Sequence, residues 1–147
     1  MGVFYLLVAW PLALGAGLVD PHTALGSPVS LLALALRVFL LPSLVEEAFF
    51  RVLLNPHPAE EPARNAVLGR GASSLLVYVL VHPLAGLLLR APVPFFDPAF
   101  LLLTTLLGAA CLLLYLRSGS IWPPVTLHWL VVTAWLILGG RGVLNAG

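Results

Sequence analysis

Long apolar runs alternate with short polar connectors along the whole chain. Five runs approach or reach the roughly 20 residues that a helix needs to cross a bilayer; they are residues 3–19, 28–54, 71–89, 98–116 and 121–140. The connectors hold most of the Pro, Asn, Asp and Arg residues, as breaks between membrane helices should; they are residues 20–27, 55–70, 90–97 and 117–120. No run alternates like a barrel strand, and lipid admits only helices or closed barrels. The pattern therefore predicts an all-α, polytopic membrane helix bundle with about five transmembrane helices.

Composition supports a membrane protein and excludes several other classes. The chain is 61% hydrophobic and 9% charged, whereas soluble domains are about 25% charged. A soluble globular domain and a disordered chain are therefore excluded, and the lipid bilayer is the expected surrounding. The net charge of +1 gives no reason to expect a nucleic acid partner. The single cysteine, Cys111, lies in an apolar run and should pack as a small hydrophobe.

The 147 residues suit one membrane domain, 1–147, with a motif-bearing core at about 28–140 and an additional N-terminal helix and loop at 1–27. We expect an integral, multi-pass membrane protein. Arginines are slightly more frequent on the side that holds the N-terminus and the connectors 55–70 and 117–120. The positive-inside rule then predicts a cytoplasmic N-terminus. The pattern does not indicate an oligomeric state.

Two glutamates and an arginine interrupt the second apolar run. Glu47 and Arg51 are four residues apart and share one helix face, which predicts an ion pair. Glu46 points about 140° away from Arg51, so it has no charge partner in its own helix. Such a carboxylate suits a general base or acid. The alternative is a helix end at which both glutamates lie in headgroup water.

Two histidines lie inside other apolar runs. Tyr78 and His82 share a helix face, and His128 follows the tandem prolines that favour a helix start. Each histidine has an alternative structural role, such as a buried imidazole bonded to a backbone carbonyl. Helix rise places Glu46, His82 and His128 roughly 12, 15 and 9 Å below the same membrane side. The three side chains are therefore expected to share one polar site. By contrast, His22, His57, Glu60 and Glu61 lie in connectors and are expected to be solvated.

A carboxylate near two imidazoles inside a membrane supports two kinds of chemistry. Glu46 could take a proton from water that attacks a peptide carbonyl, while His82 and His128 stabilise the oxyanion. Alternatively, the three side chains could hold Zn²⁺ with an open fourth position, although the usual HExxH signature is missing. A serine nucleophile is disfavoured because the chain contains no GxSxG.

At these residues the chain resembles the CPBP family of intramembrane proteases, also called the Abi or CAAX-protease family. That family carries EExxxR, an aromatic-xxx-His motif and His-xxx-Asn on separate membrane helices. Residues 46–51 match the first motif in full, residues 78–82 match the second with Tyr in place of Phe, and residues 119–128 resemble the third. The family's Asn position is Val132, which removes one proposed hydrogen-bond donor to the oxyanion.

The resemblance implies a glutamate-type intramembrane endopeptidase that acts on a membrane-associated protein or peptide and needs no cofactor. It assigns Glu46 as the base that activates water, Glu47 and Arg51 as its support, and His82 and His128 as transition-state stabilisers. The family was earlier described as metal-dependent, so zinc stays the alternative cofactor. Family members also include scaffolds and bacteriocin-immunity proteins, and the Val132 departure favours this second kind of function. An ion-conducting carrier is a third hypothesis, disfavoured because the chain has no internal repeat.

Overall fold

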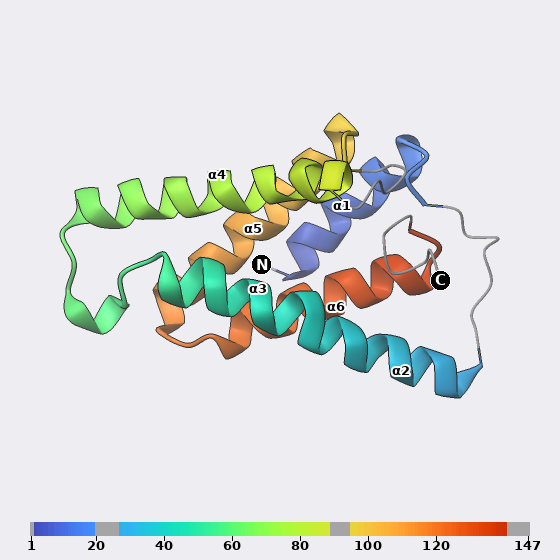
Figure 1. Cartoon of the computed structure of the whole chain (residues 1–147), viewed down its shortest axis with the longest axis horizontal. Helices are drawn as coiled ribbons and strands as arrows, with labels where there is room; N and C mark the ends of the chain where they lie inside the picture. Colours follow the sequence, from blue (N-terminus) through green and yellow to red (C-terminus); the bar gives the residue numbers. More distant parts are fainter. Residues whose placement is uncertain (1, 20–26, 89–94, 141–147) are drawn as a thin grey trace.

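The computed structural model describes residues 2–19, 27–88 and 95–140, and their regular structure is helical throughout (Figure 1). In chain order the helices are α1 (Gly2–Gly15), α2 (Pro28–Val38), η1 (Phe39–Leu44), α3 (Val45–Glu47), η2 (Ala48–Leu53), η3 (Pro58–Glu60), α4 (Arg64–Leu88), α5 (Pro98–Ser118) and α6 (Trp122–Ile137). One isolated β-bridge joins Val19 to Gly140, and the described residues form no strand. The predicted all-α bundle is confirmed.

Three helical stretches are long and apolar enough to cross a membrane, namely Pro28–Glu60, α4 and α5. The first of them combines α2, η1, α3 and η2 into one winding ribbon that ends in η3. Helices α1 and α6 are apolar but shorter, with 14 and 16 residues. The chain is thus an integral membrane helix bundle, whereas the cytoplasmic N-terminus stays a prediction.

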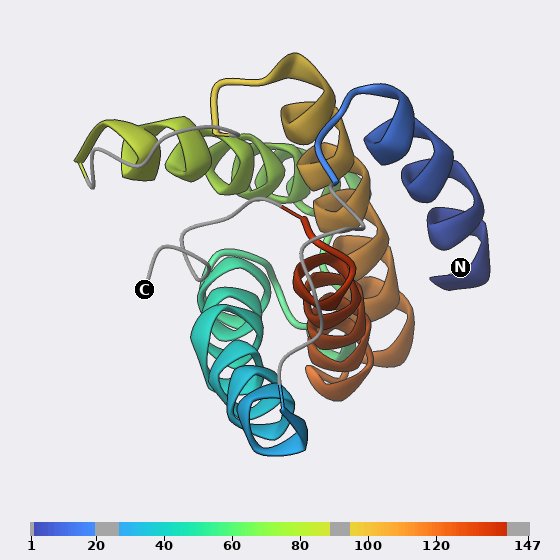
Figure 2. The ribbon, with the colours of Figure 1, turned by 90° about the vertical axis from the view of Figure 1, so that its right-hand side faces the viewer.

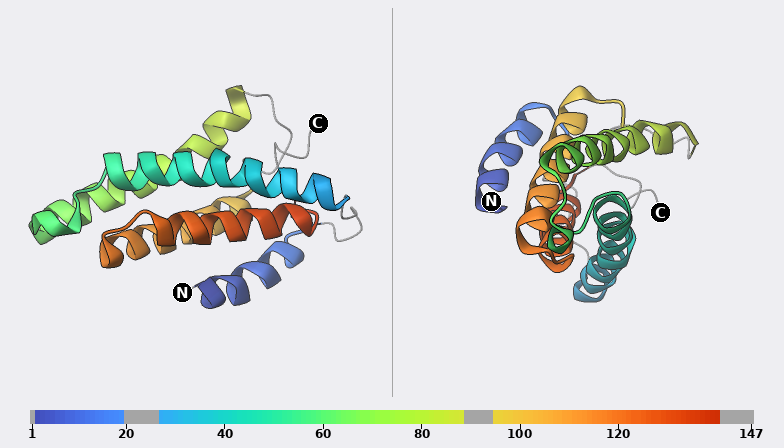
Figure 3. Two further views of the ribbon diagram at one scale, coloured as in Figure 1. Left: turned by 90° about the horizontal axis from the view of Figure 1, so that it is seen from below. Right: turned by 90° about the vertical axis from the view of Figure 1, so that its left-hand side faces the viewer.

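Helices α5 and α6 form the centre of the bundle. Helix α5 packs against α1, α4 and α6, while α6 also packs against α2 and η1. Figure 2 shows α5 between α1 and the other helices, and the left view of Figure 3 shows the ribbon from α2 to η2 beside α6. A hydrogen bond from Trp129 Nε1 to the Ala35 carbonyl oxygen, 2.8 Å long, joins α6 to α2. This arrangement puts the Glu46-Glu47 segment next to the helix that carries His128.

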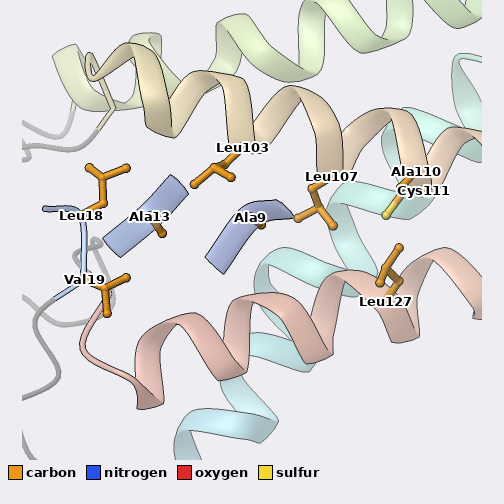
Figure 4. Close-up of a cluster of buried hydrophobic side chains, with 9 residues drawn as sticks. All are labelled: Ala9, Ala13, Leu18, Val19, Leu103, Leu107, Ala110, Cys111 and Leu127. Atoms are coloured by element: carbon orange, nitrogen blue, oxygen red, sulfur yellow. The ribbon is translucent and has the colours of Figure 1, made fainter. Parts of the chain in front are cut away.

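The apolar core lies where α1, α5 and α6 meet, as Figure 4 shows. It contains Ala9 and Ala13 from α1, Leu103 and Leu107 from α5, and Leu127 from α6. Cys111 belongs to the same cluster and is fully buried, so its predicted role as a small hydrophobe is confirmed. Away from this core, many leucines and valines of α2 and α4 are exposed on the outside of the bundle. Those side chains would face lipid rather than water in a membrane.

The structure corrects one predicted boundary and confirms a predicted break. Helix α4 begins at Arg64, so the polar connector expected at 55–70 ends seven residues earlier than predicted. A helix bonds its own backbone and can therefore extend past its apolar part into the membrane surface. The kink expected at Pro42 is present, because Leu41 leaves the helical conformation (φ −136°, ψ 112°), as residues before proline tend to do. The connectors at 20–26, including His22, and at 90–94 lie outside the described residues.

Candidate active site

The segment that carries both glutamates is wound differently from an ordinary α-helix. The short helix α3, Val45–Glu47, lies between two six-residue π-helical stretches, η1 and η2. Such wide turns inside helices occur frequently at functional sites. Two side chains hold the Phe50 carbonyl oxygen in η2, because Asn55 Nδ2 donates to it at 2.7 Å and Ser74 Oγ at 2.6 Å. The local winding is therefore tied to α4.

Glu47 is the central acceptor of the site. Its Oε2 accepts a hydrogen bond from Arg51 Nε at 2.8 Å, and its Oε1 accepts one from His128 Nδ1, also at 2.8 Å. The side chains of Glu47 and Arg51 are fully buried, and His128 is 2% exposed. The ion pair expected from the four-residue spacing is present. Spacing along the chain does not indicate that the same carboxylate also binds the imidazole of α6.

Glu46 lies on the other side of the His128 ring. Its Oε2 is 4.0 Å from His128 Nε2, which is too long for a direct hydrogen bond. This oxygen is buried and has no hydrogen-bond partner among the described residues, while the Glu46 side chain keeps 27% exposure. Glu46 is therefore the more exposed side chain of the two, and it has no charge partner in its own helix, as the helical geometry predicted.

The Tyr78 ring lies between the two histidines. Its centroid is 5.2 Å from the ring of His82, 6.3 Å from that of His128 and 5.1 Å from that of Phe50, in edge-to-face arrangements. The Arg51 guanidinium carbon lies 5.2 Å from the same centroid, in a cation–π geometry. Three elements, η2, α4 and α6, are thus joined around one aromatic ring.

A glycine on α5 makes room for this ring. A Cβ added at Gly108 would come within 2.7 Å of Tyr78 Cδ1 and within 2.8 Å of Leu75 Cδ1, closer than real Cβ atoms approach. Helices α4 and α5 therefore pack closely at this point only because residue 108 has no side chain.

His82 shows the backbone contact that was the structural alternative for this residue. Its Nδ1 lies 2.9 Å from the Tyr78 carbonyl oxygen. Since a carbonyl only accepts, Nδ1 carries the proton in this contact. The ring also lies 5.9 Å from Phe100 and 6.2 Å from Phe95. His82 is thus connected to His128 by the Tyr78 ring, which contacts both imidazoles. Its Nε2 is the nitrogen left for other partners.

Several buried polar groups lie on the Glu47 face of this winding segment. Ser43, Glu47, Arg51 and Asn55 occupy every fourth position and are all buried. Ser43 Oγ, Arg51 Nη1 and Nη2, and Asn55 Oδ1 have no hydrogen-bond partner among the residues that the structure describes. Because buried polar groups are normally satisfied, this row indicates a polar interior that extends from the glutamates toward the connector. Sequence reasoning missed Ser43 and Asn55, although their spacing could have revealed them.

The zinc alternative finds no ligand set in the described part of the chain. No three His, Cys, Asp or Glu side chains there are placed to hold a metal ion together. In both histidines Nδ1 is engaged, in His128 by Glu47 and in His82 by the Tyr78 carbonyl, so Nε2 is the nitrogen left for other partners. The zinc alternative stays a prediction.

His57 is exposed, as expected, and it also makes two contacts that its position in a connector did not predict. Its side chain is exposed, but Nε2 lies 3.0 Å from the Gly119 carbonyl oxygen, and Nδ1 accepts a hydrogen bond from Ala59 N at 3.1 Å. Glu60 and Glu61 are exposed as expected. A proline on each side of His57 was a signal of an ordered turn.

Comparison with known proteins identifies the family to which the chain belongs. Searches of curated proteins and of solved structures gave no match. A family model described as "Type II CAAX prenyl endopeptidase Rce1-like" matches residues 28–134, which include all five predicted site residues: Glu46, Glu47, Arg51, His82 and His128. The match covers most of the chain and omits only α1 and the two ends. The chain therefore belongs to the Rce1-like family of type II CAAX prenyl endopeptidases, as the resemblance to CAAX proteases predicted.

Proposed function

We propose that this chain is an intramembrane endopeptidase that hydrolyses a peptide bond of a membrane-associated protein, with Glu46 as the base. The observation that carries the proposal is the position of Glu46: its buried Oε2 lies 4.0 Å from His128 Nε2 without a hydrogen-bond partner among the described residues, while the side chain as a whole is 27% exposed. One water molecule bound to both atoms can span such a distance. Glu47 does not serve as the base, because Arg51 and His128 already occupy its two oxygens.

The proposed reaction uses this pair of atoms in two steps. Glu46 takes a proton from the bound water while the water oxygen attacks the substrate carbonyl carbon. Negative charge develops on the carbonyl oxygen, and a proton on His128 Nε2 hydrogen-bonds it. The peptide C–N bond then breaks, and Glu46 returns its proton to the leaving amine. The products are a carboxylic acid and an amine, which become a carboxylate and an ammonium ion after a proton passes between them, and the site regains its starting state.

Glu47 and Arg51 are proposed to fix His128 in its working form. Glu47 Oε1 accepts from Nδ1, which fixes the ring orientation and leaves Nε2 directed at Glu46. With His128 protonated, two carboxylates are balanced by two cations, His128 and Arg51. This neutrality matters because an uncompensated charge costs several kcal/mol in a buried site.

His82 is proposed to bind the substrate from the other side of Tyr78. Its Nδ1 proton is used by the Tyr78 carbonyl, so a neutral ring offers an acceptor at Nε2. A neutral His82 can therefore accept from a substrate N–H, and it donates to an oxyanion only as an imidazolium. The neighbouring rings of Phe95 and Phe100 provide an apolar surface for a hydrophobic substrate.

The family description suggests a prenylated peptide that ends in a CAAX sequence as the substrate to try first. The full chain, reconstituted in lipid vesicles, would be incubated with such a peptide, and the released C-terminal tripeptide would be quantified. Glu46→Gln keeps the shape of the side chain but removes the base, so we expect a loss of about 10²- to 10⁴-fold in kcat. Glu61→Gln removes an exposed carboxylate in the connector and should cleave at the wild-type rate.

Two outcomes would count against this function. Wild-type cleavage by Glu46→Gln would remove Glu46 from the mechanism. Loss of activity with a strong chelator, restored by Zn²⁺, would replace the glutamate mechanism with the metal-dependent one. We expect activity to survive chelation.

A catalytically impaired scaffold is the second candidate, and Val132 is the observation that favours it. This residue stands at the family's Asn position and packs against the apolar core cluster. If wild-type vesicles bind the peptide without cleaving it, the scaffold function would be supported.

A further inference from the structure

His57 joins the end of the glutamate-bearing segment to the turn between α5 and α6. It lies in the connector just after η2, and its Nε2 is 3.0 Å from the carbonyl oxygen of Gly119, 62 residues away. The imidazole also lies edge-to-face on Tyr115 of α5, with ring centroids 6.3 Å apart. The connector, helix α5 and the turn that follows α5 therefore meet at this one ring.

The partners of His57 specify a single form of the imidazole. The Gly119 carbonyl can only accept, so Nε2 carries a proton; the Ala59 backbone N–H can only donate, so Nδ1 is unprotonated. The ring is thus used at both nitrogens in its neutral form. One bond caps the short helix η3, and the other crosses to the α5–α6 turn.

The Gly119 carbonyl is itself held in place. Gly119 ends α5 in the left-handed conformation (φ 63°), and its N–H donates to the Tyr115 carbonyl oxygen at 2.8 Å. Glycine adopts this conformation without the penalty that other residues meet. Helix α6 begins three residues later at Trp122 and carries His128 in its second turn. A bond to Gly119 therefore fixes the start of the helix that supplies the imidazole.

The same two segments are joined deeper in the bundle by Glu47 and His128. Two contacts therefore join the same two segments: His57 to Gly119 at the exposed end, and Glu47 to His128 in the buried interior. The chain between η2 and His57 has little freedom to move, because Asn55 and Pro56, which precede His57, are both buried.

We propose that His57 is a positioning residue, which holds the glutamate-bearing segment against the start of α6 so that His128 Nε2 stays aligned with Glu46. We call the contact between His57 and Gly119 the clamp. Its catalytic consequence rests on the proposed function, whereas the clamp itself is a structural contact. Nothing in the family's three motifs includes this connector residue.

Two substitutions separate the bonds that His57 makes. Asn places a polar atom near the Nδ1 position and can keep the cap on Ala59, but it does not reach Gly119. Gln places its amide nitrogen near the Nε2 position and can still donate to Gly119, but it loses the cap. Spin labels on Ala59→Cys and Thr126→Cys, two exposed positions, would report the spacing between the connector and α6 in vesicles. Cys111 is fully buried and should not be labelled.

We expect His57→Asn to broaden the distance distribution between the labels and to lower kcat toward the prenylated peptide roughly five- to tenfold, with KM unchanged. His57→Gln should retain the wild-type distance and rate. The clamp is overturned if His57→Asn matches the wild type in both measurements, or if His57→Gln fails as badly as His57→Asn. The distance measurement requires no hydrolysis, so it decides the clamp even if Glu46→Gln shows that the chain is not a glutamate protease.

Discussion

His128 Nδ1 donates a 2.8 Å hydrogen bond to Glu47 Oε1 across 81 residues of sequence. This contact connects the fully buried Glu47–Arg51 ion pair of one segment to the imidazole of another. It leaves the second ring nitrogen, Nε2, near the more exposed Glu46. One carboxylate thereby orients the histidine while the other stays available for chemistry.

Replacing Glu47 by Gln should destabilise the protein as well as inactivate it. The change leaves the Arg51 charge fully buried without its counter-charge, and breaking a buried pair in this way costs about 3–5 kcal/mol. Thermal unfolding of the detergent-solubilised chain would measure the loss. The double variant Glu47→Met, Arg51→Met removes both charges and should recover much of the stability without activity. If Glu47→Gln were as stable as the wild type, the Glu47–Arg51 ion pair would not stabilise the fold.

Gly108→Ala should disturb the site by displacing the Tyr78 ring. The added methyl group would collide with Tyr78 and Leu75, and overpacking of this kind costs about 1–3 kcal/mol. Gly69→Ala is the matched control, since nothing lies within 4 Å of a Cβ at that helical position. We expect a lower melting temperature and slower cleavage for Gly108→Ala only. Equal behaviour of the two alanine variants would mean that α4 and α5 can separate without affecting Tyr78.

His82→Asn can separate the structural role of this residue from the functional one. The Asn amide can still donate to the Tyr78 carbonyl, which His82 Nδ1 contacts at 2.9 Å, but it supplies nothing at the Nε2 position. We expect a near-normal melting temperature together with a rise in KM or a fall in kcat of at least tenfold. Full activity of this variant would reduce His82 to a residue that only bonds the backbone.

Val132→Asn should increase cleavage by restoring the amide at the family's Asn position. Residue 132 follows His128 by one helical turn, so the new N–H group can approach the same oxyanion. A rise of roughly tenfold in kcat is expected, below the full effect of an oxyanion donor because the surrounding shape was built around valine. Val131→Asn, on the same helix, is the control for the polar substitution itself. No difference between the two variants would indicate that position 132 does not face the reacting atoms.

Some of the site follows from local geometry and was therefore predictable. Four-residue spacing on a helix is enough to pair Glu47 with Arg51 and to turn Glu46 away from both. Apolar run length predicted about five membrane helices, and three of the described helices, Pro28–Glu60, α4 and α5, reach the length that a bilayer demands. The other two, α1 and α6, are apolar but shorter than predicted. Exact helix ends were less predictable, and the start of α4 at Arg64 shows why: a helix can continue where its apolar residues stop.

Composition and helix periodicity are local properties, so the amino-acid sequence alone predicts an apolar, all-helical chain with two adjacent glutamates and two histidines inside its apolar runs. The packing of the helices decides which carboxylate receives His128, how Tyr78 separates the two imidazoles, and that His57 reaches Gly119. These relationships depend on the relative placement of helices. That placement is set by contacts between residues distant in the chain, such as the fit of Tyr78 against Gly108, and no helical repeat encodes it.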